Sequence, residues 1–232
     1  GGLIVIVVMP ESLHIETFCL GDWMTNCFVV HAAAQAGACW IVDAGASPQA
    51  MLDYIRQKSL QPQQVLLTHA HLDHIAGLHA IRALWPDIPI LIHKAEREFL
   101  TDPMLNLSVM LDQPIVAPQA TDFLEHGQTL KLDGVRFEVR HTPGHSPGGV
   151  TLYQQQTATA IVGDTLFAGS IGRYDFPTSN GPLLIESIQA QLMTLPDPTR
   201  VLPGHGPETT IGQERVTNPY LQELPLDLRE QA

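Results

Sequence analysis

Short apolar and β-branched runs recur along the chain, separated by segments rich in Gly, Pro or polar residues. Runs of about four to eight such residues between turn signals are typical of β-strands. We therefore predict strands at residues 15–20, 27–30, 39–42, 65–67, 90–93, 135–140, 150–153 and 160–162.

Other segments repeat their apolar residues with the spacing of an amphipathic helix. These predicted helices span residues 48–58, 75–85, 95–100 and 182–195. Because strands and helices alternate, the chain is expected to belong to the α/β class and not to the all-β class. Residues 101–120 show little periodicity and contain Pro103, Pro114 and Pro118, so we predict a long loop there, near the mouth of a functional site.

No shift in composition divides the 232 residues, so we predict one domain over residues 1–232. The apolar run at residues 3–9 is far shorter than the roughly twenty residues that span a bilayer. We expect residues 1–9 to form an extra N-terminal strand or an extension, and we expect no membrane partner. The absence of Lys or Arg before Arg56 argues against a basic secretory leader.

The formal charge of −12 argues against nucleic-acid binding, because such binding depends on Lys and Arg that neutralise phosphates. Cys19, Cys27 and Cys39 form no metal-binding pair, and an odd number leaves one thiol unpaired. These features favour a reducing compartment, with the thiols as small core side chains. We therefore expect a cytoplasmic protein.

The segment Thr68-His69-Ala70-His71-Leu72-Asp73-His74 follows a predicted strand and precedes a predicted helix. Neutral imidazole is a common ligand of transition metals. Two histidines spaced by one residue on an extended backbone share a face, so His69 and His71 can hold one ion. Asp73 and His74 lie where the chain turns into the helix, so they can serve a second ion.

Three segments further along supply matching donors where the apolar or β-branched runs at residues 135–141, 159–162 and 200–202 would each end as a strand. Thr142-Pro143-Gly144-His145-Ser146-Pro147 and Leu202-Pro203-Gly204-His205-Gly206-Pro207 place a histidine after a Pro-Gly turn, and Val162-Gly163-Asp164-Thr165 ends a strand with a carboxylate. The set is then seven: His69, His71, Asp73, His74, His145, Asp164 and His205.

Seven donors are too many for one zinc ion, which takes three or four protein ligands, and suit two ions. We assign His69, His71 and His145 to the first ion and Asp73, His74 and His205 to the second. Asp164 is expected to bridge them, because its two oxygens can each meet a cation. A nitrogen and oxygen donor set fits zinc, which we expect, and also iron or manganese.

These motifs resemble the metallo-β-lactamase superfamily, in the branch of glyoxalase II and its short single-domain bacterial relatives. The resemblance covers roughly residues 15–220 and includes Val42-Asp43-Ala44-Gly45 and the segments at residues 163–177 and 202–213. It implies an αββα four-layer sandwich, with the dinuclear site at one edge of two facing sheets.

Metal binding lowers the pKa of water to about 7, so a hydroxide bridging two ions is a nucleophile at neutral pH. We expect Asp73 to orient this hydroxide and Asp164 to hold both ions. The resemblance implies hydrolysis of a small-molecule thioester, of the hydroxyacylglutathione type. Arg173 and Tyr174 are candidate substrate contacts, whereas Asp43 and Ser146 are candidate supports of the ligand loops.

Alternative functions share these motifs. Persulfide dioxygenases of the superfamily use one iron and carry a segment like Gly172-Arg173-Tyr174-Asp175-Phe176, and lactonases use similar ligands. Metal count and oxygen uptake would separate the dioxygenase from the hydrolase. A β-lactamase is less favoured, because one main class has Cys where Asp164 stands, and this chain has no Cys after Cys39.

Overall fold

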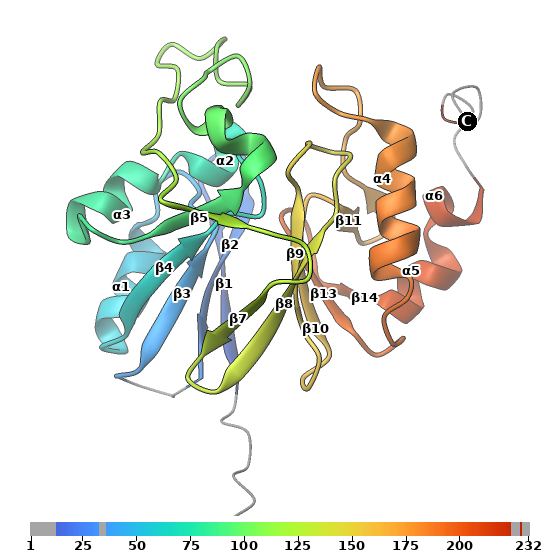
Figure 1. Ribbon diagram of the computed structural model, residues 1–232, viewed down its shortest axis with the longest axis horizontal. Helices are drawn as coiled ribbons and strands as arrows, with labels where there is room; N and C mark the ends of the chain where they lie inside the picture. The colour runs from blue at the N-terminus through green and yellow to red at the C-terminus, as the bar shows by residue number, and fades with distance from the viewer. Residues whose placement is uncertain (1–12, 33–35, 224–227, 229–232) are drawn as a thin grey trace, which may run out of the picture.

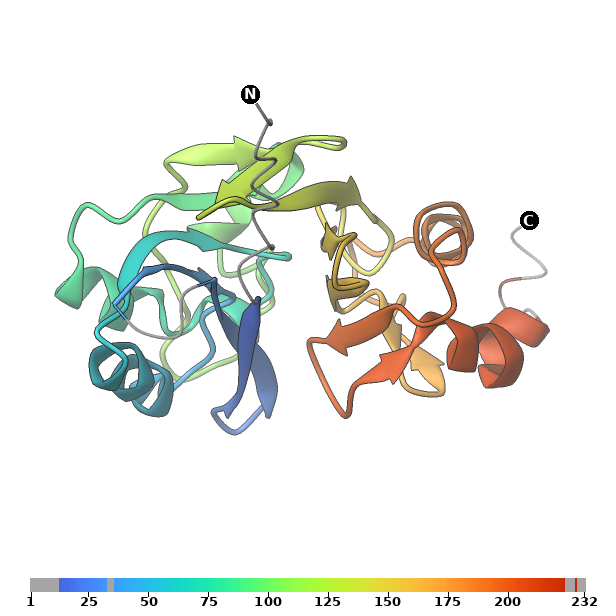
Figure 2. The same cartoon turned by 90° about the horizontal axis from the view of Figure 1, so that it is seen from below.

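The protein, described here from a computed structural model, forms two facing sheets with helices on both outer sides (Figures 1 and 2). The structure describes residues 13–32, 36–223 and 228. The four layers run helix, sheet, sheet, helix, which confirms the predicted αββα sandwich. The prediction for residues 1–9 lies outside the described residues.

The first sheet has the order β1-β2-β3-β4-β5-β6, antiparallel at its start and parallel from β3 onward. Its strands are β1 (His14–Leu20), β2 (Thr25–His31), β3 (Ala38–Val42), β4 (Gln61–Leu66), β5 (Ile90–His93) and β6 (Asp122–Leu124). Helices α1 (Gln49–Gln57), α2 (Leu72–Ile75) and α3 (Leu78–Leu84) accompany this sheet, with the 3-10 helix η1 (Lys94–Leu100) after β5.

The second sheet has the order β14-β13-β10-β9-β8-β7, and only β10 and β13 pair in parallel. Its strands are β7 (Thr129–Leu132), β8 (Val135–His141), β9 (Val150–Gln154), β10 (Thr159–Gly163), β13 (Arg200–Pro203) and β14 (Thr209–Thr210), beside the small hairpin β11 (Leu166–Phe167) and β12 (Ser170–Ile171). Helices α4 (Gly181–Ser187), α5 (Ile211–Thr217) and α6 (Pro219–Gln222) lie outside it, with the π-helical turn η2 (Ile188–Leu192) extending α4 (Figure 1).

Central strands of the first sheet are buried on both faces, because side chains alternate between two cores. In β2, Val29 packs into the core beneath the helices, whereas Phe28 packs into the core between the sheets. Trp40 of β3 meets Phe137 of β8 across that central core, with ring centroids 5.3 Å apart. Continuous apolar runs such as 27–30 therefore reflect burial on two sides.

The helix predicted at residues 75–85 is divided into α2 and α3 around Gly77. The Gly77 amide donates to the carbonyl of Ala44 at 2.7 Å. A Cβ on Gly77 would lie 2.3 Å from the Gly45 oxygen, so the two backbones touch here. The break lets the chain turn against the loop that follows β3.

Other boundaries also differ from the sequence prediction. Strand β4 begins at Gln61, four residues before the predicted start at residue 65. The polar residues at its start, including Pro62, pair with β3 on one side and do not pair with β5 on the other. Strands β6 and β7 were missed, since they are short and gain their pairing from distant segments. The helix predicted at 95–100 is a 3-10 helix, and that at 182–195 continues as a π-helical turn.

Residues 101–120 form no helix or strand, as predicted. The loop is held by buried side chains: the Asn106 amide donates to the carbonyls of Phe99 and Ile115, and the Ser108 hydroxyl accepts from the Ile115 amide. Its Asn106 carbonyl also accepts from the amide of Leu72, beside the His-rich segment. Within the described residues, no helix is long and apolar enough to cross a membrane.

The close approach at Gly77 gives a test of this packing. Gly77→Ala should lower the free energy of unfolding by about 1–3 kcal/mol, the usual cost of forcing extra atoms into a packed site. The local helix preference acts in the same direction, because Gly77 is the N-cap residue of α3 and Gly is favoured over Ala at that position. Urea denaturation measures the change, and an alanine variant as stable as the wild type would contradict the observed contact.

Candidate metal centre

All seven predicted donors meet at one edge of the sandwich, where strands of both sheets end. The donors come from four segments, which follow β4, β8, β10 and β13, and two of the donors, Asp73 and His74, lie in the short helix α2. They fall into three overlapping groups whose ligand atoms lie within 4.8 Å of one another: His69, His71 and His145; His69, His74 and Asp164; Asp73, His74 and His205. The first and third groups match the two sets expected from the sequence, although their role as ligands stays a prediction.

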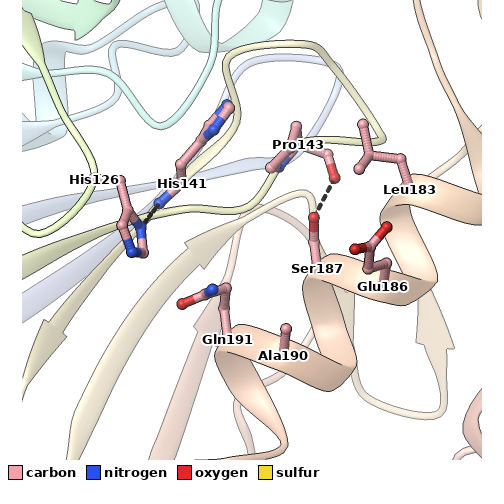
Figure 3. Close-up of a pocket in the computed structure, with 8 residues that line it drawn as sticks. All are labelled: His126, His141, Pro143, Leu183, Glu186, Ser187, Ala190 and Gln191. Atoms are coloured by element: carbon pink, nitrogen blue, oxygen red, sulfur yellow. Dashed lines mark hydrogen bonds between the residues drawn. The ribbon is translucent and has the colours of Figure 1, made fainter.

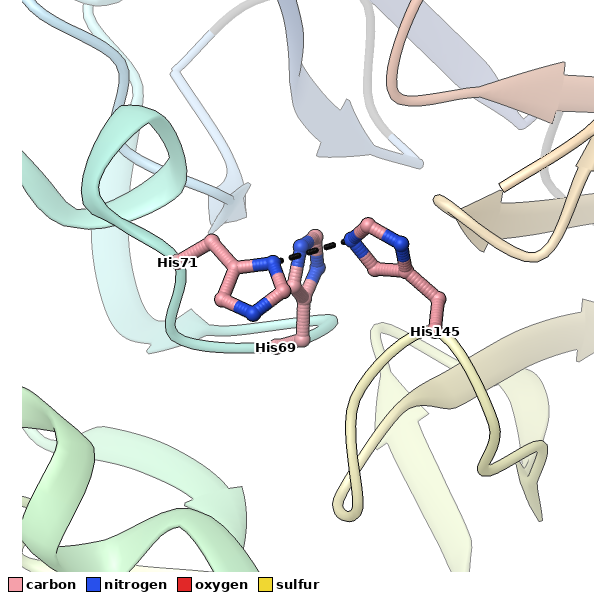
Figure 4. Close-up of side chains that lie close together, drawn as sticks. All are labelled: His69, His71 and His145. Carbon is pink, nitrogen blue, oxygen red and sulfur yellow. Dashed lines mark hydrogen bonds between the residues drawn. The ribbon is translucent and has the colours of Figure 1, made fainter. Parts of the chain in front are cut away.

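The first group joins the two halves of the sandwich. His69 and His71 lie on the loop after β4, and His145 faces them from the loop after β8 (Figure 4). His71 Nδ1 lies 2.9 Å from His145 Nε2, and all three side chains are buried. The alternate spacing of His69 and His71 therefore aims both rings at one point, as the extended backbone predicts.

The second group is more acidic and more open. His205 Nε2 lies 3.0 Å from Asp73 Oδ2, and His74 Nε2 lies 3.3 Å from the same oxygen. The hydroxyl of Thr25, at the start of β2, donates to Asp73 Oδ2 at 2.8 Å. His205 is the most exposed of the group, so this side of the centre faces solvent.

Asp164 lies between the two groups. Its Oδ2 is 3.5 Å from His145 Nε2 and 3.4 Å from His205 Nε2, which belong to different groups. Its Oδ1 is 3.4 Å from His74 Nε2. This intermediate position is the one a bridging carboxylate needs.

Hydrogen bonds from outside the cluster fix two ring orientations. His145 Nδ1 donates to the Arg173 carbonyl at 2.8 Å, which leaves Nε2 facing the cluster. His74 Nδ1 donates to Asp43 Oδ2 at 2.8 Å, and the Asp43 carboxylate also accepts from the amide and hydroxyl of Thr68. Such outer contacts are typical of metal-binding histidines. Asp43 thus makes the supporting hydrogen bonds expected from the sequence.

Several donor atoms have no hydrogen-bond partner among the described residues. His69 Nε2, His71 Nε2, His74 Nε2 and Asp164 Oδ1 are all buried in this way. Buried polar atoms without a partner are costly and call for an explanation. Cations would satisfy them, and a nitrogen and oxygen set suits zinc, iron or manganese. The residues present therefore fit a divalent metal centre.

Electrostatics divide the centre into two parts. Burial lowers the pKa of His69 well below its usual value and that of His71 to about 3, so both rings are neutral and able to bind a metal. Burial also acts to lower the pKa of His205, but hydrogen bonds to Asp164 and Asp73 outweigh it and raise this pKa to about 10. The part of the centre around Asp73 and Asp164 therefore stabilises positive charge.

Two glycines of the Pro-Gly-His turns are required by close packing. A Cβ on Gly204 would lie 2.1 Å from Asp164 Oδ1, and one on Gly144 would lie 2.3 Å from the Leu184 Cα. Gly144 also has a φ of 138°, which side chains rarely adopt. At these turns the backbone packs directly against neighbouring elements, so a residue with a side chain would not fit before either histidine.

Helix α4 holds the loop that carries His145 from outside. The Ser187 hydroxyl donates to the Pro143 carbonyl at 2.7 Å, as Figure 3 shows. The Ser179 hydroxyl donates to the carbonyl of His145 itself at 2.6 Å. The neighbouring cavity of about 270 Å³ in Figure 3 contains no predicted donor; it is lined by His126, His141, Pro143, Leu183, Glu186, Ser187, Ala190 and Gln191.

A cavity of about 420 Å³ opens onto the metal donors. Its walls combine donors from both groups with apolar side chains and one guanidinium; they are Trp23, His71, Leu72, Asp73, Leu107, His145, Asp164, Phe167, Arg173, Phe176 and His205. Leu107 belongs to the loop of residues 101–120, so the loop does lie beside the site as predicted. A small substrate can therefore reach the cluster along an apolar wall.

The two predicted substrate contacts differ in position. Arg173 lines the cavity, where its guanidinium lies 4.3 Å from the Phe176 ring centroid and forms two hydrogen bonds to Asp175. Tyr174 instead lines a separate cavity with Tyr220 and packs against the core beneath α4. The structure thus brings Arg173 to the metal centre and leaves Tyr174 outside this cavity.

Ser146 lies beside a carboxyl that the sequence analysis missed, Glu96. Burial raises the pKa of Glu96, while the nearby Ser146 hydroxyl and hydrogen bonds from the amides of Ala70 and Gly148 act to lower it. Thr25, Thr68 and the apolar walls of the cavity were also missed. Local sequence carried no signal for them beyond ordinary core and turn positions, because their roles depend on contacts between distant segments.

Comparisons with known proteins agree with this geometry. A family model described as the metallo-beta-lactamase superfamily matches residues 20–205. "Probable metallo-hydrolase YqgX" of Bacillus subtilis is 43% identical over 184 residues, covering 79% of this chain and 87% of that protein. "Hydroxyacylglutathione hydrolase GloC" of Haemophilus influenzae is 33% identical, covering 90% of this chain and 98% of that protein.

Solved structures give the same result. The B3 metallo-beta-lactamase BLEG-1 superposes with a TM-score of 0.85 at 39% identity, covering 90% of this chain and all of that one. The protein TTHA1623 in a di-iron-bound form gives a TM-score of 0.77 at 34% identity, covering 89% of this chain and all of that one. With the fold, the donor cluster and the family match in agreement, the chain belongs to the metallo-β-lactamase superfamily.

Proposed function

We propose that this protein is a metal-dependent hydrolase that cleaves small-molecule thioesters of the hydroxyacylglutathione type. The observation that carries the proposal is the position of Asp164 between a buried group of donors and a more open one, on the wall of an open cavity. The match to the hydroxyacylglutathione hydrolase GloC supports the thioester substrate.

His69, His71 and His145 would hold one divalent ion, Asp73, His74 and His205 a second, and Asp164 both. Zinc fits these donors, and iron is supported by the di-iron form of TTHA1623. When bound, such ions lower the pKa of water to about 7 and polarise a carbonyl oxygen. No nucleophilic side chain is then needed.

The side chains have separate tasks in this reaction. Asp73 and Asp164 both line the cavity, where they are placed to accept a hydrogen bond from the attacking water and to orient it. Thr25 holds Asp73 Oδ2 by its hydroxyl, which keeps that carboxylate in place. Asp43 accepts a hydrogen bond from His74 Nδ1, which keeps that ring in place.

The cavity walls suit a substrate with an apolar part and a negative charge. Trp23, Leu107, Phe167 and Phe176 can contact the carbon and sulfur atoms beside the thioester carbonyl. Among the described residues that line the cavity, Arg173 is the one cationic side chain other than histidine, so a substrate carboxylate would bind there. A thiol product can leave through the same open mouth.

A second candidate reaction is β-lactam hydrolysis. The chain is 39% identical to the B3 metallo-beta-lactamase BLEG-1 over the whole of that chain. The same donors and the same water could serve an amide carbonyl in a strained ring, and a carboxylate on that ring could also bind Arg173. Measured turnover of the two substrate classes decides between them.

Metal content and substrate preference can be measured together. Elemental analysis of the purified protein should give two equivalents of divalent metal, and S-lactoylglutathione should be hydrolysed with a larger kcat/KM than a β-lactam. Removal of the ions by a chelator should abolish turnover, and zinc should restore it. A single iron with oxygen uptake would instead support a dioxygenase.

Asp164→Ala should remove metal and activity together, because both donor groups lose a shared carboxylate. Replacing outer contacts of metal ligands typically costs about 10–100-fold in affinity or activity, so loss of this ligand should lower kcat/KM by more than about 100-fold. Asp112→Ala, an exposed change on the long loop, is the control. Two retained equivalents of metal with full hydrolysis would show that the ligand assignment is wrong.

Arg173→Ala should raise KM for a carboxylate-bearing thioester while metal content stays the same. The guanidinium is exposed and already paired with Asp175, so we expect about 1 kcal/mol, or about fivefold in kcat/KM. Arg200→Ala is a matched control, since Arg200 forms a similar exposed pair with Glu208 and does not line the cavity. Equal effects of the two changes would exclude Arg173 as a substrate contact.

A further inference from the structure

Glu96 is a fully buried carboxylate placed between the two loops that supply the three-histidine group. It lies on η1, at a residue whose φ of −114° interrupts the helical backbone. Its side chain has no exposed surface. Burying a carboxylate is costly unless hydrogen bonds compensate it, so its contacts indicate why it is there.

Each oxygen of Glu96 accepts from a different ligand loop. Oε2 accepts from the Ala70 amide at 2.5 Å, and Ala70 stands between His69 and His71. Oε1 accepts from the Gly148 amide at 2.8 Å, three residues after His145. One side chain therefore ties together the backbone of both loops.

The fit around Glu96 leaves little room for other arrangements. A Cβ on Gly148 would lie 2.8 Å from the Glu96 Cγ, so only glycine lets the carboxylate come this close. Both partners are N–H donors, and only a group with two acceptor atoms can satisfy them. The side chain of a glutamine ends in one oxygen, which accepts, and one NH2 group, which donates. A glutamine here would therefore place its NH2 group against one of the two backbone N–H groups.

We propose that Glu96 is a positioning residue that sets the spacing of the loops and thereby the metal-binding geometry of His69, His71 and His145. The inference rests on the proposed metal-dependent function. It goes beyond that function by assigning the three-histidine group a structural support of its own, supplied by a segment that contributes no donor.

The other donor group has different supports. Asp43 accepts from His74, and Thr25 donates to Asp73. The Asn26 side-chain amide donates to the carbonyls of Pro203 and Gly206, on either side of His205. None of these hydrogen bonds involves Glu96. Changing Glu96 should therefore affect the two ions unequally.

Glu96→Gln tests this, with Glu214→Gln as the matched control. Glu214 is also buried and its carboxylate accepts from the Gly169 amide, the Thr209 hydroxyl and the Asn218 side chain, but it joins no ligand loops. Metal-free wild type and variants are titrated with Zn²⁺ in competition with a chromophoric chelator. Visible spectra of the Co²⁺ forms then report the coordination of each ion.

We expect Glu214→Gln to bind two ions, each with about the same affinity as in the wild type. In Glu96→Gln the Kd of one ion should rise about 10- to 100-fold, while that of the other changes less than about threefold. The Co²⁺ spectrum should change for the weakened ion alone. If Glu96→Gln does not fold, Gly148→Ala decides, because its Cβ pushes against Glu96 and should weaken the same ion.

The possible failures are distinguishable. Unchanged affinities in the Glu96 and Gly148 variants, or equal weakening of both ions, would overturn the positioning role while leaving the hydrolase proposal standing. The same selective loss in Glu214→Gln would also overturn it, since any buried glutamate would then have that effect. A wild-type protein that binds fewer than two ions would overturn the dinuclear function, and this inference with it.

Discussion

His74 is the point at which three carboxylates meet, two of them buried and the third, Asp73, partly buried, and the rest of the site depends on how that charge is balanced. Its Nδ1 lies 2.8 Å from Asp43, and its Nε2 lies 3.3 Å from Asp73 and 3.4 Å from Asp164. Negative charges buried so close together are unfavourable without compensating cations. Without metal, protonated histidines can supply part of that positive charge. Burial acts to lower the pKa of His74, but the neighbouring carboxylates outweigh it and raise this pKa well above its usual value. Two divalent ions at the proposed centre would supply it more fully.

The architecture explains how such a cluster can be held in place. The donors sit on loops, but each loop follows a strand of a sheet that is buried by a helical layer, so its starting point is fixed. Further contacts then orient the ligand segments: Asp43 accepts from His74, helix α4 binds the loop of His145 at Pro143, and Glu96 lies between the first two segments. Metal ligands keep their geometry when rigid contacts around them fix their side chains.

Local signals in the sequence predicted the α/β class and the meeting of the donors, whereas the four-layer arrangement followed from the family resemblance. Apolar runs such as 27–30 mark strands buried on two faces, and a histidine after Pro-Gly marks a sharp turn at a strand end. The split at Gly77, the polar strand β4 and the small strands β6 and β7 left no such signal, since distant segments supply their contacts. Glu96 was missed for the same reason: on a short polar helix it reads as a surface residue, and only the fold buries it. Tyr174 was placed by its neighbourhood in sequence, but it lines only the cavity beside Tyr220, whereas Arg173 lines both that cavity and the one at the predicted metal donors.

The three-histidine group takes two members from one half of the sandwich and one from the other, and the acidic group likewise draws His205 from the second half. Any ion held there links the halves at the open end of the molecule, in addition to the apolar core between the sheets. Because a ligand that binds only the folded chain stabilises it by mass action, metal binding at the proposed centre would make the heat resistance of this protein depend on the free metal concentration. Donors proposed for catalysis would then also make metal supply a determinant of how long the folded protein persists.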